Sequence, residues 1–223
     1  MNKLLAVYQA IIGYFHSTAF AACCQRTVSL AIVAQKLLDH VRTADFLAPL
    51  LLRLYLAPIF WMAGSKKLLS FGNTVEWFGN TDWGLGLPLP GLLACLVVSG
   101  EVLGALFLLF GFAVRWISMP LMASMAVAAF TVHWKNGWLA IASGSGVFST
   151  DRTMAAVQQL QKAKEILGQY GDLAELTRYG DLVMLNNGIE FAVTYFIMLL
   201  ILLFMGCGRY VSVDYWLRRR YLS

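Results

Sequence analysis

The stretch LAPLLLRLYLAPIFWMAGSKKLL, residues 47–69, decides the fold class because it is apolar over almost its whole length. As an α-helix it is long enough to cross a hydrocarbon core of about 30 Å. One charge, Arg53, lies inside the stretch, and Lys66 and Lys67 lie near its end. A charge inside lipid is costly and normally turns toward neighbouring helices. The stretch therefore predicts the first span of a bundle of membrane helices.

Three further apolar stretches have the length of a membrane span, at about Leu89–Phe112, Trp116–Trp134 and Gly188–Met205. The whole chain is 59% hydrophobic and only 13% charged, whereas soluble domains carry roughly 25% charged residues. A bilayer solvates so much apolar surface, but water does not. We therefore predict an all-α, polytopic membrane protein in which residues 47–217 form a four-transmembrane-helix bundle in contact with the lipid bilayer.

The two ends of the chain are more polar than the spans. We expect residues 1–46 to form one or two amphipathic helices on the membrane surface, with a fifth span over Leu4–Cys24 as the alternative. Residues 218–223 form a basic tail that contains the triplet Arg218–Arg220. Such a cluster favours the anionic cytoplasmic leaflet, so four spans place both termini in the cytoplasm.

A polar insertion, residues 135–187, separates the third and fourth spans. Its Gly- and Ser-rich start predicts a flexible loop. Thr150 or Asp151 then caps an expected surface helix, which ends near Gly168 or Gly171. We expect this helix to dock on the bundle or on the lipid headgroups.

Composition and spacing argue against several function classes. The formal net charge is +5, but the basic residues form no stripe of the kind that binds nucleic acid. The four cysteines, Cys23, Cys24, Cys95 and Cys207, do not have the spacing of a zinc or iron–sulfur site. The chain also contains no P-loop or dinucleotide fingerprint. No cofactor is therefore evident from the sequence.

The charges inside the predicted spans are the first candidates for function. Arg53 lies roughly 9 Å from the cytoplasmic end of the first span, and Glu101 lies roughly 15 Å from the same end of the second. A long Arg side chain can bridge most of that difference. We therefore predict an Arg53–Glu101 pair with Tyr55 as a polar neighbour. The pair either serves chemistry or only holds the bundle together.

A second group of candidates gathers at the opposite end of the spans. His133 ends the third span, and Glu190 begins the fourth. Together they can relay a proton or ligate a metal. Lys66 or Lys67 can pair with Glu190 or bind an anionic or quinone-like head group, with Asn187 at the same level. Alternatively, the lysine at position 67 only anchors its helix at the interface.

A methionine run, Met119, Met122 and Met125, lies in the third span. Thioethers are soft ligands that suit Cu(I), so Met122 and His133 are candidate metal ligands. A methionine stripe at helical spacing also has a simpler interpretation, the packing of the bundle.

Several of these stretches resemble the DoxX family. LLLRLYLAPIFWMAGSKKL is similar to the first span of DoxX proteins, SGEVLGALFLLFGFAVRW to the second, and NNGIEFAVTYF followed by GCGRYVSVDYWL to the last span and its exit motif. The usual proline between the exit glycines is Cys207 here. The resemblance implies a bacterial inner-membrane protein linked to quinone- or thiol-dependent redox complexes. It points to Arg53, Lys67, Glu101, His133 and Glu190 as functional positions.

A narrower resemblance concerns the HvfX branch of that family. WFGNTDWGLGLPLP, AAFTVHWKNGWLAIA and the long insertion are similar to that branch, which is associated with maturation of copper-binding, ribosomally made peptides.

Three hypotheses follow. The first is an accessory redox subunit that binds a quinone or peptide between its helices and works with a protein partner. The second is binding or transport of copper or a copper-binding peptide. The third is a scaffold that recruits soluble partners through residues 135–187.

Overall fold

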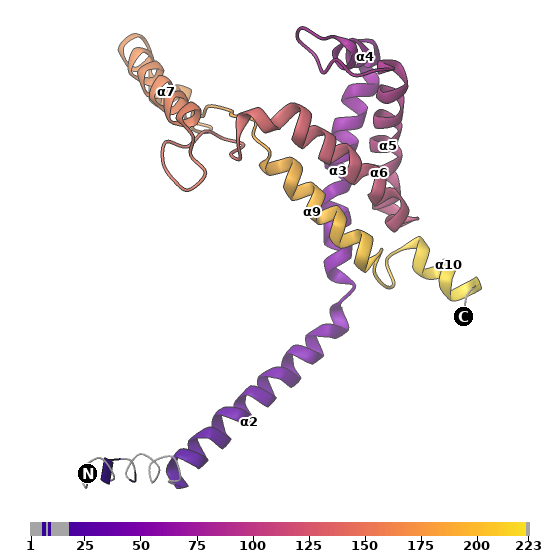
Figure 1. The fold of residues 1–223 in the computed structure, drawn as a ribbon, viewed down its shortest axis with the longest axis vertical. Coiled ribbons are helices and arrows are strands. Elements are labelled where there is room, and N and C mark those ends of the chain that lie inside the picture. Colours follow the sequence, from indigo (N-terminus) through magenta and orange to yellow (C-terminus); the bar gives the residue numbers. More distant parts are fainter. Residues whose placement is uncertain (1–5, 8, 10–17, 222–223) are drawn as a thin grey trace. The chain divides into compact units, whose positions relative to one another are not determined.

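The computed structural model describes residues 6–7, 9 and 18–221, and Figure 1 shows them as a chain of helices. Outside the helices, an isolated antiparallel bridge joins Ile141 to Leu185. The all-α prediction is therefore confirmed. The chain divides into two compact units, Met1–Phe46 and Leu47–Ser223, and each is described by itself.

The first unit contains the long helix α2, Thr18–Val41, and the short turn η1, Arg42–Ala44. One or two helices were expected in this segment, and α2 is one of them. Several apolar side chains along it, among them Leu30 and Leu38, are exposed. Most of the alternative fifth span, Leu4–Cys24, lies outside the residues that the structure describes.

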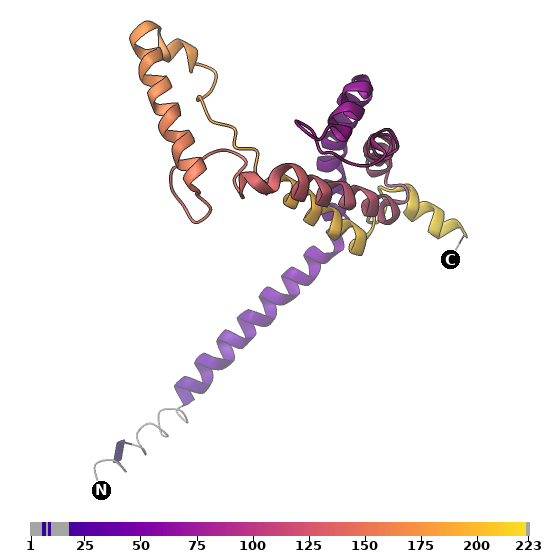
Figure 2. The ribbon, with the colours of Figure 1, turned by 45° about the horizontal axis from the view of Figure 1, so that its top comes forward.

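The second unit is built on α3, Leu47–Leu69, and α5, Pro90–Phe110, which lie side by side in Figures 1 and 2. The short helix α4, Phe71–Gly79, connects them. The two long helices approach closely because residue 64 is a glycine. A Cβ built at Gly64 would lie 2.9 Å from Val102 Cγ2 and 3.0 Å from Glu101 Cβ. This contact fixes Glu101 against α3.

The other pair of helices is α6, Val114–Val127, and α9, Glu190–Met205, which also pack along one another. After α6 the chain widens into a π-helical turn, η2 (Ala128–His133), and then tightens into a 3-10 turn, η3 (Trp134–Asn136). The packed core between the two pairs includes Leu56, Phe60, Leu108, Leu121 and Leu199.

Three helical runs of the described residues are long and apolar enough to cross a membrane: Arg42–Leu69, Pro90–Phe110 and Val114–Asn136. They correspond to the first three predicted spans, although the second, predicted over about Leu89–Phe112, is shorter at both ends. The expected fourth span coincides with the apolar helix α9, which has only 16 residues. At 1.5 Å per residue it is about 24 Å long, less than the roughly 30 Å of a hydrocarbon core.

The bundle has an Arg53 end and a His133 end. At the Arg53 end, α3 and α6 begin and α5 and α9 finish. At the His133 end, η2 and η3 meet the start of α9. The C-terminal helix α10, Val213–Tyr221, follows α9 at the Arg53 end and contains the predicted basic triplet.

The insertion contains the predicted surface helix as α7, Asp151–Tyr170, followed by the short helix α8, Leu173–Leu176. Thr150 caps α7 in a reciprocal arrangement with Thr153, and Gly171 ends it. The helix and its cap are therefore confirmed. The helix that α7 packs against is α8 and not a helix of the bundle, so of the two expected docking surfaces the lipid headgroups stay a prediction.

Candidate functional site

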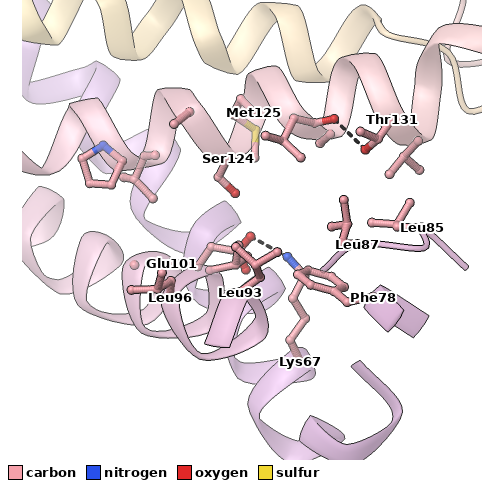
Figure 3. Close-up of a pocket in the computed structure, with 18 of the residues that line it drawn as sticks. Lys67, Phe78, Leu85, Leu87, Leu93, Leu96, Glu101, Ser124, Met125 and Thr131 are labelled. Atoms are coloured by element: carbon pink, nitrogen blue, oxygen red, sulfur yellow. Dashed lines mark hydrogen bonds and ion pairs between the residues drawn. The ribbon is translucent and has the colours of Figure 1, made fainter. Parts of the chain in front are cut away.

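A cavity of about 600 Å³ lies between α5 and α6 and is bounded on a third side by α4 and the loop after it. Most of the lining is apolar; Phe78, Leu85, Leu87, Leu93 and Met125 are labelled in Figure 3. The polar lining residues are Lys67, Glu101, Ser124, Thr131 and His133. The cavity thus combines an apolar body with a few polar groups, as small-molecule sites do.

Lys67 and Glu101 form the polar centre of this cavity, with Lys67 Nζ 2.5 Å from Glu101 Oε1. Side chains on a helix lean toward its N-terminus. The ammonium of Lys67 therefore reaches back by about one turn, to the level of Gly64, where Glu101 contacts α3. The Glu101 side chain is only 2% exposed, whereas that of Lys67 is 31% exposed. The pair joins a buried carboxylate to a partly solvated cation.

The second carboxylate oxygen, Glu101 Oε2, is buried and has no hydrogen-bond partner. Such an atom is uncommon, because leaving a buried polar group unsatisfied costs free energy. Figure 3 shows the Glu101 carboxylate facing across the cavity toward Ser124 on α6. A buried hydrogen-bond acceptor without a donor, on the wall of an apolar cavity, is the strongest sign of a ligand site in the described part of the molecule.

Arg53 does not pair with Glu101, so that prediction is wrong. Its guanidinium is buried at the other end of the bundle, where it donates to four backbone carbonyls. The acceptors are Leu108 O (2.8 Å) and Leu109 O (3.2 Å) at the end of α5, and Cys207 O (2.6 Å) and Val211 O (3.0 Å) after α9. Carbonyls at helix ends lack intrahelical partners and favour cations. Arg53 therefore joins three helices and is not part of the cavity.

Two neighbours complete this join at the Arg53 end. Gly111 has φ of +67°, and a Cβ there would lie 2.7 Å from Arg53 Cζ. Asp214 of α10 accepts hydrogen bonds from the Ala113 and Val114 N–H groups at the start of α6. The region therefore braces the bundle. This role of Asp214 was not predicted from the sequence, because a single acidic residue in a polar tail does not indicate which helix it caps.

Two other residues proposed from the first span also lie outside the cavity. Tyr55 is 53% exposed on α3, and Lys66 is exposed. Neither lines the cavity. Of the two lysines, only Lys67 turns inward, and its partner is Glu101 and not Glu190.

The polar group at the His133 end is held together by backbone groups. His133 Nδ1 lies 2.9 Å from Asn187 O, and Asn136 Nδ2 donates to the same oxygen. Glu190 Oε2 instead accepts from the Ala140 N–H at 2.9 Å. Among the described residues, His133 and Glu190, proposed together for a proton relay or a metal site, thus bind different backbone groups and form no hydrogen bond or ion pair with each other. His133 does reach the cavity, whereas Asn187 and Glu190 do not line it.

The two candidate metal ligands do not lie together. Met122 packs against the hydrophobic core. It precedes His133 by eleven residues, a separation of about 16 Å along the helix, which is too far for one ion. Within the residues that the structure describes, no group of three His, Cys, Asp or Glu side chains could hold a metal ion.

Several lining residues were missed from the sequence. Trp77, Phe78, Leu85 and Leu87 close the cavity from α4 and its loop. They lie in WFGNTDWGLGLPLP, between the first two predicted spans. Apolar residues in this connection were the available signal, but the direction in which their side chains point depends on the tertiary structure.

Comparison with known proteins gives one match. Residues 48–134 match the family model described as DoxX. The matched stretch runs from α3 into η3 and contains most of the cavity lining, including Lys67, Glu101 and His133. The resemblance to DoxX proteins is confirmed at this level. No curated protein and no solved structure matches the chain.

Proposed function

We propose that this DoxX-like membrane protein is an accessory subunit of a redox system and that its cavity binds a quinone-class ligand beside Lys67 and Glu101. The observation that carries the proposal is the buried, unpartnered Glu101 Oε2 on the wall of a largely apolar cavity. A quinone has a flat apolar ring, an apolar tail and two ring oxygens that become hydroxyl groups on reduction, so this class of ligand matches both kinds of lining.

The size and lining of the cavity support a small amphipathic ligand. Ligand sites usually occupy roughly 300–1,000 Å³ and contain few polar groups, and the volume of about 600 Å³ falls in that range. Leu85, Leu87, Leu93 and Met125 would contact the ring and tail. The cavity lies between α5 and α6, which we place in the membrane. Quinones dissolve in lipid and could reach it there.

The polar groups would handle protons. Lys67 is partly exposed and contacts buried Glu101, so its ammonium could give a proton to the carboxylate and regain one from water. His133 Nδ1 faces a carbonyl oxygen, which can only accept. The neutral ring therefore carries its proton on Nδ1, which leaves Nε2 as an acceptor. Arg53 and Glu190 would act through the backbone, not on the ligand.

The setting follows from the same proposal. The protein would lie in a bacterial inner membrane with both termini in the cytoplasm, and α9 would complete a four-span bundle. Electrons would come from or pass to a protein partner. Support for the maturation of a copper-binding peptide, as in the HvfX branch, would be one biological use of that chemistry.

The test is equilibrium binding of a decyl-substituted benzoquinone to the purified protein in mild detergent. Leu93→Trp fills the cavity and should abolish binding. Leu92→Trp is the matched control, since Leu92 is 57% exposed and does not line the cavity. Equal binding by both variants would show that the quinone does not enter this cavity, and the proposal would be withdrawn.

Recruitment of a soluble partner is a second candidate role, and the position of α7 favours it. The helix does not pack on the bundle, and Tyr170 and Tyr179 beside it are 87% and 93% exposed. Deleting residues 144–180 should abolish capture of the partner while leaving the bundle folded. Retained capture would exclude this role.

A further inference from the structure

The charge state of the pair at the centre of the cavity determines what the ligand must offer. Lys67 Nζ donates to Glu101 Oε1 at 2.5 Å, so the two side chains form an ion pair. Within this ion pair Glu101 is a carboxylate, whose oxygens only accept hydrogen bonds. The free Oε2 therefore requires a donor.

Thr131 and His133, two other polar residues of the cavity wall, already have partners. The Thr131 hydroxyl donates to Val127 O at 2.7 Å. His133 Nδ1 is committed to Asn187 O. Neither group supplies the missing donor to Glu101 Oε2, which leaves that role to a bound molecule.

Ser124 differs from the other serines of α5 and α6. Ser99 and Ser118 each donate to the carbonyl four residues earlier, both at 2.7 Å, as serines in helices commonly do. Among the described residues, Ser124 has no such partner. It faces Glu101 across the cavity in Figure 3. Its hydroxyl is therefore available to a ligand that is already bound to Glu101.

We infer that the ligand presents a hydroxyl group, donating to Glu101 Oε2 while the oxygen of that hydroxyl accepts from Ser124. This inference rests on the proposed quinone-class site and specifies the form bound, namely the reduced hydroquinone. A quinone carbonyl can only accept, so it would face the carboxylate without a hydrogen bond. Ser124 is thereby assigned as a specificity-determining residue.

Three probes of one skeleton test the inference: a decyl-substituted hydroquinone, its quinone, and its di-O-methyl ether, which keeps the shape but has no donor. In the wild-type protein the hydroquinone should bind at least tenfold more tightly than either of the others, as expected for a hydrogen bond to a charged acceptor. The comparison uses no variant, so misfolding cannot obscure it.

Variants locate the effect. Glu101→Gln should remove most of the preference for the hydroquinone. Ser124→Ala should weaken hydroquinone binding by roughly three- to tenfold, whereas Ser99→Ala should leave it unchanged, because Ser99 does not line the cavity.

The possible failures are distinct. If the quinone or the ether binds as tightly as the hydroquinone, and Leu93→Trp abolishes that binding, the inference is overturned and the quinone-class site stands. If none of the probes binds, or if Leu93→Trp has no effect on binding, the site itself is refuted, and the inference with it.

Discussion

Replacing Arg53 by methionine should destabilise the bundle without involving the cavity. The substitution keeps an apolar stem but removes the donors to the carbonyls of Leu108, Leu109, Cys207 and Val211. Leu108 O keeps one donor, the Gly111 N–H at 3.3 Å, so three carbonyls lose their contact. At about 1–1.5 kcal/mol for each lost hydrogen bond, the free energy of unfolding should fall by about 3–5 kcal/mol.

The measurement is unfolding by sodium dodecyl sulfate in mixed micelles, followed by circular dichroism. Arg53→Lys should give an intermediate loss, because a compact ammonium lacks the planar fork of a guanidinium. Arg115→Met is the control: Arg115 is exposed and donates to Phe204 O at 3.0 Å, so its loss should cost less than about 1 kcal/mol. Ligand binding by folded Arg53→Lys should match the wild type.

Two results would refute this reasoning. If Arg53→Met unfolds within about 1 kcal/mol of the wild type, the four contacts do not hold the helices together. If Arg53→Lys is stable but no longer binds the benzoquinone, Arg53 has a role in the site that its position does not explain.

Three further predictions concern local structure. Gly64→Val should lower the free energy of unfolding by about 1–3 kcal/mol, because its side chain would clash with α5, whereas Gly72→Ala, with open space around it, should change it little in the same titration. Asp214→Asn should cost about 1 kcal/mol, since it weakens the charged cap on α6; an unchanged transition midpoint would contradict this. Thr150→Ala should speed amide hydrogen exchange in the first turn of α7 and leave exchange in α5 unchanged. Equal protection of this turn in the variant and the wild type would argue against the cap.

The sequence predicted the helices well because apolar length and caps are local properties. The first span has the predicted bounds, Leu47–Leu69, and α7 begins after Thr150 as expected. These signals do not depend on which helices become neighbours. The fourth span was overestimated in length by two residues, because Gly188 and Ile189 are apolar but belong to the turn that holds the insertion.

The partners of the charged residues could not be predicted in the same way. From their depths along the helices, we predicted that Arg53 and Glu101 would form a pair. Arg53 instead donates to backbone carbonyls. Because every residue has a carbonyl, no sequence pattern indicates which ones Arg53 will bind. Lys67 lines the cavity, but it pairs with Glu101 and not with Glu190, which was one of the partners considered. Its inward turn depends on the close approach at Gly64, which requires knowledge of how α3 and α5 pack.

Because Ala128–His133 form a π-helical turn, the side-chain positions at the His133 end depend on the number of residues in that turn. Such a turn accommodates one residue more than an α-helix of the same rise. Deleting that extra residue would let the helix continue regularly, with the residues after it in nearly the same orientation. Inserting a further residue would instead rotate everything after it by about 100°. The imidazole would then leave the cavity wall, and Asn136 would lose its place opposite Asn187. Relatives with one residue more in this turn should therefore differ in ligand preference more than their overall similarity suggests.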